Sequence, residues 1–136
     1  MTTSPLEIVR SFYTRIWNRG EYAAADRLCH DDLTFRGSLG QVRRGREEFL
    51  EYVRSVREGL SDYVCELQEA VVEGDRVFAR MLFSGVHTGM FEGVAPTGAR
   101  VRWAGAALFT LEEDRIRDLW VLGDVKGLHD QLSAGG

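Results

Sequence analysis

The sequence predicts an α+β fold in which N-terminal helices pack on a bent antiparallel sheet. Apolar residues recur at helical spacing through the first sixty residues, and the period changes to two from Tyr63 onward. Turn residues then divide the second half into four strand-length segments. Helices followed by strands are typical of an α+β domain. If such a sheet is strongly bent, it wraps over the helices as a cone with a cavity open at one end, where a ligand can be bound. The periodicity itself predicts the α+β class and not the cone.

Length and charge narrow the function classes. The 136 residues predict a single domain spanning residues 1–136. The net charge of −4 offers no basic excess, which argues against a nucleic-acid partner. No apolar run approaches the ~18 residues of a membrane helix, and the start lacks a signal-peptide pattern, so we expect a cytoplasmic protein without a membrane partner. Cys29 and Cys65 are expected to be reduced core thiols rather than a disulfide or a metal pair.

Three helices are predicted before the sheet. Ser4-Pro5-Leu6-Glu7 is a capping box with proline at the first helical position, and the apolar face that follows continues to Trp17. Gly20 ends this helix, and an alanine-rich helix follows over 22–28. A third helix is predicted over 47–60, with two glutamates in its first turn.

The strands of the second half follow from alternation and turns. They are predicted at 63–72, 76–86, 101–110 and 115–122. Residues 33–35 form a brief extended piece, and 36–46 is predicted to be a loop. The glycines and proline of 87–99 predict a long connection, and 126–132 predicts a short final helix.

Two polar residues are candidates for proton transfer. Asp124 follows an apolar run ending at Gly123, and a poorly solvated carboxylate there would be a proton shuttle near neutral pH. The alternative is that Asp124 caps the last helix. His87, at a strand end, would donate to a ligand carbonyl or act as a base, or would instead be bonded to the loop backbone.

Aromatic residues cluster on the last hairpin. Trp103, Phe109 and Trp120 are candidates for bordering a ring-shaped ligand, although each also fits a core position. Strand parity makes both faces of this hairpin substantially apolar. One face would meet the helices and the cavity and the other a second subunit, so the sequence predicts a homodimer through the sheet.

Two clusters of charged residues lie before the predicted sheet, and each is either an ordinary surface feature or part of a binding site. Four arginines fall within eleven residues: Arg36, Arg43, Arg44 and Arg46. Either these arginines are solvated side chains of a surface loop, or one of them lies at the pocket mouth and orients an anionic or enolic substrate. His30, Asp31 and Asp32 lack the spacing of a metal site, so we expect no metal.

Three segments carry a resemblance to a known family: HTGMFEGVAPTGARV (87–101), RIRDLWVLGDVKGLHDQL (115–132) and the early Trp17-Asn18-Arg19-Gly20. In these segments the chain resembles the SnoaL-like polyketide cyclase and ester cyclase family. The resemblance implies a cone of the ketosteroid-isomerase and scytalone-dehydratase type. It further implies action on an aromatic polyketide without metal or tightly bound cofactor, either ring closure by an aspartate or, in a related branch, hydroxylation of the anthracycline skeleton.

The chain departs from the cyclase pattern where the chemistry should be. The catalytic aspartate of the cyclases falls on Val121, and their polar pocket residues fall on Gly105 and Ala107. Polar residues of many members fall on Phe35 and Arg36. Asp124 replaces the missing acid only if a bulge at Gly123 turns it into the cavity.

The resemblance with these departures implies a hydroxylase-like tailoring enzyme, with oxygen and an external reductant performing the redox step. The predicted catalytic residues are Asp124, His87 and Arg36, and the predicted substrate-binding residues are Trp103, Trp120, Phe109, Phe35 and Val121. His87 and Arg36 would donate to developing oxyanion charge, and Asp124 would manage protons. The alternatives are an aldol cyclase using Asp124 and a non-catalytic binder of a hydrophobic small molecule.

Overall fold

The computed structural model describes residues 4–134, and its elements follow the predicted order. The helical elements are α1 (Pro5–Ser11), the π-helix η1 (Phe12–Asn18), the 3-10 helix η2 (Tyr22–Ala24), α2 (Ala25–Leu28), α3 (Gly45–Gly59) and α4 (Val125–Ala134). The strands are β1 (Cys29–Arg36), β2 (Val42–Arg44), β3 (Leu60–Glu73), β4 (Arg76–His87), β5 (Arg100–Glu112) and β6 (Arg115–Gly123). No helix among residues 4–134 is long and apolar enough to cross a membrane.

The six strands form one mixed sheet in the order β2-β1-β6-β5-β4-β3. The α+β class with helices on a bent sheet is confirmed, and the sheet is open because β2 and β3 remain edges. The expectation of a wholly antiparallel sheet was wrong at one place, since β1 pairs in parallel with β6. This pairing adds β1 and β2 to the four predicted strands and lengthens the wall beside α3.

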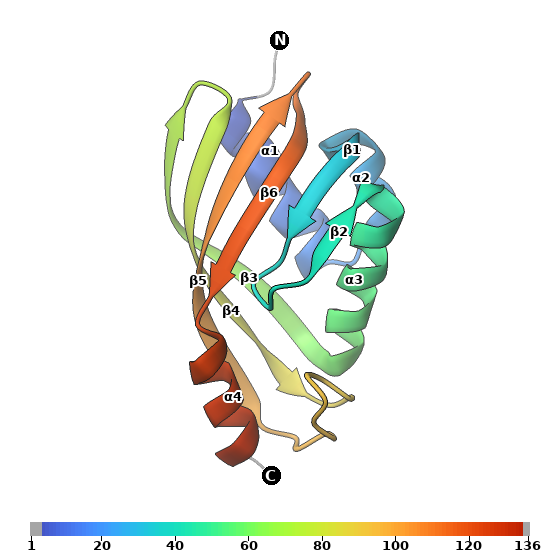
Figure 1. Ribbon diagram of the computed structural model, residues 1–136, viewed down its shortest axis with the longest axis vertical. Coiled ribbons are helices and arrows are strands. Elements are labelled where there is room, and N and C mark those ends of the chain that lie inside the picture. The colour runs from blue at the N-terminus through green and yellow to red at the C-terminus, as the bar shows by residue number, and fades with distance from the viewer. Residues whose placement is uncertain (1–3, 135–136) are drawn as a thin grey trace.

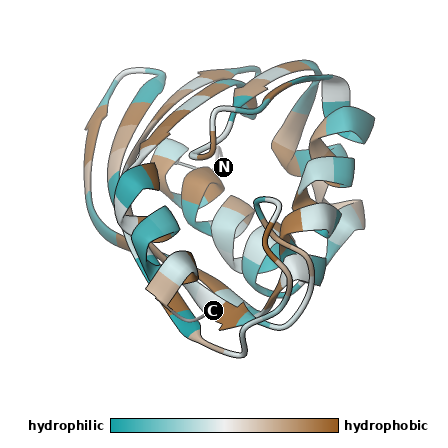
Figure 2. Cartoon of the chain, turned by 60° about the horizontal axis from the view of Figure 1, so that its bottom comes forward, coloured by the Kyte–Doolittle hydropathy of each residue, from teal (hydrophilic) through white to brown (hydrophobic). Residues whose placement is uncertain are grey.

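The sheet curls around the first helical segment. β3 and β4 bend across the molecule, with α1 and η1 against their concave side and α3 facing them (Figure 1). Figure 2 looks into this arrangement from the end that carries α4 and shows the strands wrapped around the inner helix. The concave side holds the core, so side chains that point inward from the strands meet those of α1, η1 and α3.

The first helix changes its winding where it faces the sheet. Ser4 caps α1 by accepting a hydrogen bond from the Glu7 amide at 3.2 Å, as the capping box predicts. From Phe12 the segment winds as a π-helix, a form often found at functional sites. Its wider turn places Tyr13 and Trp17, four residues apart, on the same buried side. Asn18 then closes the segment by bonding both backbone groups of Cys65 on β3.

A bulge in β6 decides which of its residues face inward. Thr110 pairs with Asp118 whereas Leu111 pairs with Ile116, so Arg117 is an extra residue in β6. Ile116 therefore points inward together with Leu119 and Val121, although simple alternation would place it on the opposite face. Trp120 and Leu122 point outward and are exposed.

Candidate functional site: an aromatic pocket under the sheet

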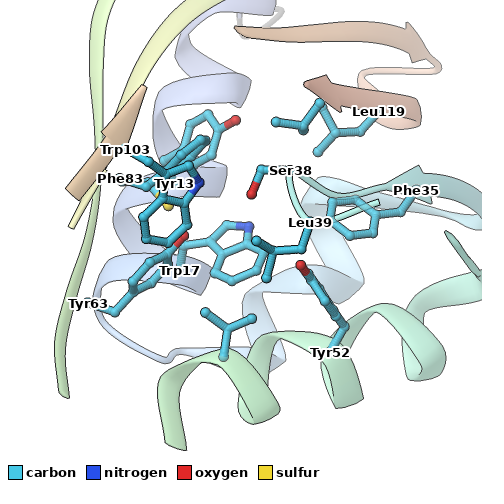
Figure 3. Close-up of a pocket in the computed structure, with 13 residues that line it drawn as sticks. Tyr13, Trp17, Phe35, Ser38, Leu39, Tyr52, Tyr63, Phe83, Trp103 and Leu119 are labelled. Carbon is cyan, nitrogen blue, oxygen red and sulfur yellow. The ribbon is translucent and has the colours of Figure 1, made fainter. Parts of the chain in front are cut away.

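A pocket lies between the π-helix, α3 and the concave face of the sheet. Most of its lining is aromatic, and the rings come from elements far apart in the sequence (Figure 3). The lining residues are Tyr13, Trp17, Phe35, Ser38, Leu39, Tyr52, Val56, Tyr63, Cys65, Phe83, Trp103, Leu119 and Val121. None of these thirteen side chains is charged at neutral pH, so the pocket suits a flat, uncharged ring.

The rings lie close enough to fill most of the pocket themselves. Trp103 packs on Phe83 with ring centroids 5.4 Å apart, and Trp17 packs on Tyr63 at 5.6 Å. The free space at the centre is about 20 Å³, room for about one water molecule. The structure therefore shows a closed slot, and a ring-sized ligand enters only when the lining residues move apart.

Two hydrogen-bond donors in this slot have no partner. Tyr13 and Trp103 are 4% and 2% exposed, and within residues 4–134 neither the Tyr13 hydroxyl nor the Trp103 Nε1 has a hydrogen-bonding acceptor. Figure 3 shows both side chains on the same side of the pocket, one from the π-helix and the other from β5. An unmade buried hydrogen bond costs about 1–3 kcal/mol, so a ligand oxygen that accepts from these groups recovers that cost.

Burial keeps the pocket's titratable groups neutral. It raises the pKa of Tyr13, Tyr52 and Tyr63 above the usual value for tyrosine, since a phenolate is poorly solvated there. Burial likewise raises the pKa of the Cys65 thiol, and nearby Tyr63 and Arg57 only partly oppose this. At neutral pH these groups donate hydrogen bonds but do not remove a proton from a substrate.

The mouth of the pocket is formed by the turn between β1 and β2. Ser38 and Leu39 project from this turn over the slot (Figure 3). The Leu39 backbone lies beside the Tyr52 hydroxyl of α3. A Cβ at Gly123 would lie 2.8 Å from the Ser38 Cβ, so glycine there lets the turn approach the end of β6. Ser38 and Leu39 therefore cover the slot on this side.

Three predicted substrate-binding residues meet in the pocket: Trp103, Phe35 and Val121. Val121 lines the wall at the place where the resemblance puts the cyclases' aspartate. Gly105 helps explain why the wall is apolar, because a Cβ there would lie 2.5 Å from the Phe83 ring. That ring thus occupies the space that a side chain at this position would need.

Asp124 lies outside the pocket. It is exposed, and its carboxylate accepts a hydrogen bond from the Gly127 amide at 3.0 Å, which makes it the N-terminal cap of α4. No bulge turns it inward, since its own amide bonds the Ala104 carbonyl on β5. Asp124 therefore caps the last helix, which was the alternative interpretation, and it does not point into the cavity as a proton shuttle would.

His87 is buried but away from the pocket lining. Its Nε2 faces the Val94 carbonyl at 3.1 Å and therefore carries the proton, since a carbonyl only accepts. Its Nδ1 accepts from the Thr97 amide at 3.3 Å. Both ring nitrogens are occupied by the connection 88–99, so His87 positions that loop and has no lone pair free to act as a base.

Arg36, Trp120 and Phe109 are the remaining predicted residues that do not line the pocket. Arg36 and Trp120 lie on the outer face of the sheet, where the guanidinium stacks 5.7 Å from the indole centroid and donates to the Val121 carbonyl. They line a shallow outer groove with Thr34. Phe109 points inward but is fully buried against Phe12 and Tyr13 and does not line the pocket.

Three tyrosines of the pocket were not predicted. Tyr13 belongs to the apolar face of the first helix, and Tyr52 and Tyr63 come from α3 and β3. In the sequence, Tyr13 and Trp17 lie four residues apart on that face, which was the available signal. Only the fold shows that the two residues face Trp103 rather than core aliphatic residues.

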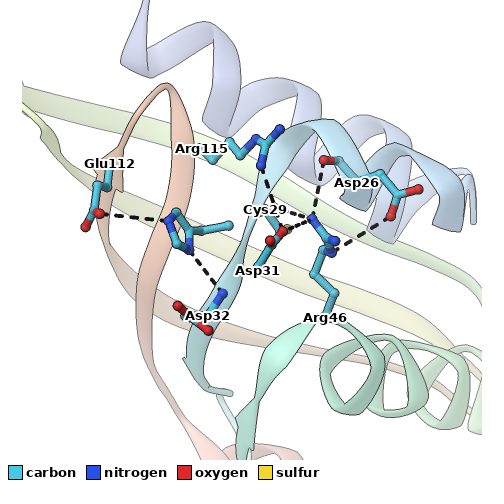
Figure 4. Close-up of polar contacts among 8 residues, drawn as sticks. Asp26, Cys29, Asp31, Asp32, Arg46, Glu112 and Arg115 are labelled. Carbon is cyan, nitrogen blue, oxygen red and sulfur yellow. Dashed lines mark hydrogen bonds and ion pairs between the residues drawn. The ribbon is translucent and has the colours of Figure 1, made fainter.

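A polar network outside the pocket joins α2, β1, α3 and the β5–β6 turn (Figure 4). Arg46 pairs with Asp31 at 2.7 Å and donates to the Cys29 carbonyl. His30, Glu112 and Glu113 bring ligand-type atoms within 4.8 Å of one another. His30 Nδ1 accepts a hydrogen bond from the Asp32 amide, and His30 Nε2 lies 3.8 Å from the Glu112 carboxylate. The His30–Glu112 contact links β1 to β5.

Comparison with known proteins relates the chain to one family. The profile of the SnoaL-like polyketide cyclase family matches residues 7–132. TsrD from Streptomyces laurentii is 29% identical, with a TM-score of 0.85 over 95% of this chain and 94% of TsrD. No curated protein sequence matches the chain.

Two more distant structures share the fold. IdmH from Streptomyces antibioticus, a proposed polyketide cyclase, is 23% identical, with a TM-score of 0.84 over 96% of this chain and 99% of IdmH. AclR from Streptomyces galilaeus, a proposed hydroxylase, is 20% identical, with a TM-score of 0.81 over 96% of each chain.

Proposed function

Since the chain belongs to the SnoaL-like polyketide cyclase family, we propose that it is a tailoring enzyme that binds a flat aromatic polyketide in the pocket under the sheet. The observation that carries the proposal is the pair of unpartnered donors, Tyr13 and Trp103, in an otherwise apolar slot. A carbonyl or phenol oxygen of the ligand accepts from one or both, while the rings of Trp17, Tyr63 and Phe83 border its faces.

The pocket activates such a ligand by hydrogen-bond donation. Tyr13 and Trp103 stabilise negative charge that develops on the ligand oxygen as it passes toward an enolate or phenolate. One well-placed donor in a dry site contributes about 3–4 kcal/mol to such a transition state. The proton itself leaves to solvent or to a group of the substrate, because the lining side chains are neutral donors.

Hydroxylation fits this pocket better than aldol ring closure. Ring closure by the cyclase route requires a carboxylate, and the pocket presents Val121 at that place while Asp124 caps α4. In hydroxylation the enolate or phenolate reacts with dioxygen. One oxygen atom converts C–H to C–OH, and the other leaves as water with two electrons and two protons from an external reductant. AclR, a proposed hydroxylase, shares this fold, so the fold is compatible with this class of reaction.

An open-ring anthraquinone-type polyketide ester tests the reaction. Incubated with the protein, air and a chemical reductant, it should give a hydroxylated product with stoichiometric oxygen uptake. A cyclised product formed without oxygen uptake would establish the cyclase alternative and reject hydroxylation. If the ester binds but gives no product with or without air and reductant, the protein is a non-catalytic binder of such molecules.

The donor pair has a sharper test, because its two groups are unsatisfied in the free protein. Tyr13→Phe should leave the free energy of unfolding unchanged or raised, since it removes an unpaired buried hydroxyl, yet weaken binding of 1,8-dihydroxyanthraquinone by about tenfold. Calorimetric titration and urea unfolding measure the two effects. Tyr22→Phe is the matched control, since Tyr22 lies outside the pocket and stacks with Arg54. Unchanged affinity in Tyr13→Phe would reject the proposed donor.

We also propose that the outer face of the sheet forms a homodimer. Strand register places Phe78, Leu108 and Trp120 in one row across β4, β5 and β6, with Leu122 beside them. Phe78, Trp120 and Leu122 are 45%, 42% and 51% exposed, and a continuous exposed row of this kind is typical of an interface. A second copy offers the same row and so covers the patch symmetrically.

Sedimentation velocity tests the dimer. The wild type should sediment as a dimer at micromolar concentration, and Leu122→Glu should convert it to a monomer because the new charge would be buried between subunits. Met90→Glu, which adds the same charge to an exposed residue of the 88–99 connection, should remain dimeric. A monomeric wild type would reject the interface.

A further inference from the structure

The pairing of β1 with β2 separates the arginines that cluster in the sequence. Phe35 pairs with Arg43, and Thr34 pairs with Arg44. Because paired residues point to the same face, Arg43 shares the inner face with the pocket residue Phe35. Arg44 shares the outer face with Thr34, and both line the outer groove. Of these clustered arginines, Arg43 therefore shares a face with the pocket residue Phe35.

Arg43 lines a polar groove that adjoins the mouth of the pocket. The groove has a volume of about 160 Å³ and lies between the β1–β2 turn, α3 and the 88–99 connection. Its lining residues are Leu39, Gln41, Arg43, Tyr52, Ser55, Val56, Met90, Phe91 and Glu92. Leu39, Tyr52 and Val56 also line the pocket, so the two hollows share one wall.

Arg43 is a partly buried residue, and its guanidinium has no acidic partner among residues 4–134. It lies 5.4 Å from the centroid of the Tyr52 ring. Its Nη1 donates only to neutral oxygens, the Gln41 side chain at 3.4 Å and the Val42 carbonyl at 3.1 Å, and it pairs with no carboxylate among residues 4–134. A guanidinium has five N–H groups, so several donors of Arg43 are free for a ligand.

The groove's acid is already paired. Glu92, on the opposite wall, contacts His129 of α4 at 3.1 Å. The groove therefore offers an unpaired cation and a paired anion, which favours a ligand that carries negative charge.

We propose that this groove is a carboxylate-binding subsite and that the ligand is an aromatic ring system bearing an acidic substituent. The proposal rests on the ring binding in the pocket. The ring lies beyond Leu39, and its carboxylate extends past Tyr52 to the guanidinium of Arg43, which holds carboxylates through two parallel hydrogen bonds. Arg43 is thus a binding residue that selects acids over neutral analogues.

Two probes of the same shape test the subsite. Calorimetric titration should show tighter binding of anthraquinone-2-carboxylate than of anthraquinone-2-carboxamide. Arg43→Gln should weaken carboxylate binding by about tenfold and leave carboxamide binding unchanged, as expected for loss of one charge-assisted contact. Arg44→Gln is the matched control, because it removes the same charge from the outer face. Glu92→Gln should tighten carboxylate binding.

The outcomes separate this inference from the proposed function. If neither probe binds, the ring pocket and the subsite both fail. If both probes bind equally and Arg43→Gln changes neither, the subsite alone is rejected. Arg43→Lys keeps the charge without the bidentate geometry and should show intermediate discrimination, which guards against a folding defect in the glutamine variant.

Discussion

Two tryptophans on neighbouring strands show how differently the two faces of this sheet behave. Trp103 on β5 points inward, is 2% exposed, and has an indole N–H without a partner. Trp120 on β6 points outward, is 42% exposed, and stacks with Arg36. The inner face holds unsatisfied donors in a dry aromatic slot, whereas polar groups of the outer face have partners or solvent.

The difference shows that residue type does not identify the site in this fold. Either tryptophan suits a ring-shaped ligand by its chemistry. What distinguishes them is the side of the sheet, which the Arg117 bulge and the strand register set. Inner-face substitutions should therefore change stability and ligand binding, and outer-face substitutions should change neither unless they alter assembly.

The largest expected effect is a cavity in the inner face. Phe109→Ala should lower the free energy of unfolding by about 3–5 kcal/mol, because Phe109 is fully buried against Phe12 and Tyr13. Arg80→Ala on the outer face removes only an exposed ion pair with Glu69 and should cost less than about 1 kcal/mol. Urea unfolding measures both, and similar losses would contradict the division between faces.

High pH should destabilise the protein through the inner face. Burial raises the pKa of Cys29 to about 12 and that of Tyr13 and Tyr63 well above 10.0. A raised folded-state pKa means that the unfolded chain loses these protons first, so stability is retained below pH 9 and falls above it. Each group contributes a slope of up to about 1.4 kcal/mol per pH unit.

Urea unfolding at several pH values, with tyrosine absorbance near 295 nm, checks this expectation. Ionisation of the pocket tyrosines should coincide with unfolding. A free energy of unfolding that stays constant from pH 8 to 11 would show that these groups are not buried as described.

Loss of His87 should affect the loop rather than a proton transfer. His87→Ala leaves the Val94 carbonyl and the Thr97 amide without partners and should cost about 1–3 kcal/mol. His129→Ala, which removes an exposed histidine, is the control and should cost less. If His87→Ala instead abolished turnover of a bound polyketide at full stability, the loop-positioning role would be wrong.

The smallest effect should come from Asp124. Asp124→Ala removes the cap of α4 and should cost about 1 kcal/mol, whereas Asp124→Asn retains a capping oxygen and should cost less. Neither substitution should change binding of 1,8-dihydroxyanthraquinone, because Asp124 does not line the pocket. A large loss of affinity in both variants would contradict this and indicate that Asp124 contacts the ligand.

Local pattern was sufficient for most of the fold. The capping box located the first helix, and period-two alternation located the four long strands to within a few residues. The parallel pairing of β1 with β6 was not predicted, because its partners are about 80 residues apart and no local periodicity records such a contact. The strand β2 was missed for the same reason, since only its pairing with β1 distinguishes it from a loop.

The site was predicted only in part. Phe35, Trp103 and Val121 were placed in the pocket by the resemblance and by aromatic clustering. Trp120 was assigned to the pocket because it is one of the clustered aromatic residues, but it points outward. Arg36 also lies on the outer face, whereas Arg43 lines the groove beside the pocket. A shift of one residue along a strand moves a side chain from the inner face to the outer face, and amino-acid composition does not reveal the strand register.

The pairing of β1 with β6 also has a consequence for biosynthesis. β1 is complete at Arg36, but the strand that flanks it on one side begins only at Arg115. At ribosomal rates of about 5–20 residues per second, the nascent chain carries an unpaired strand edge for several seconds. The aromatic wall contributed by the N-terminal helices is covered only in part, by β3 and β4, until β5 and β6 follow. We expect chaperone binding to nascent chains to persist until the last strand has left the exit tunnel.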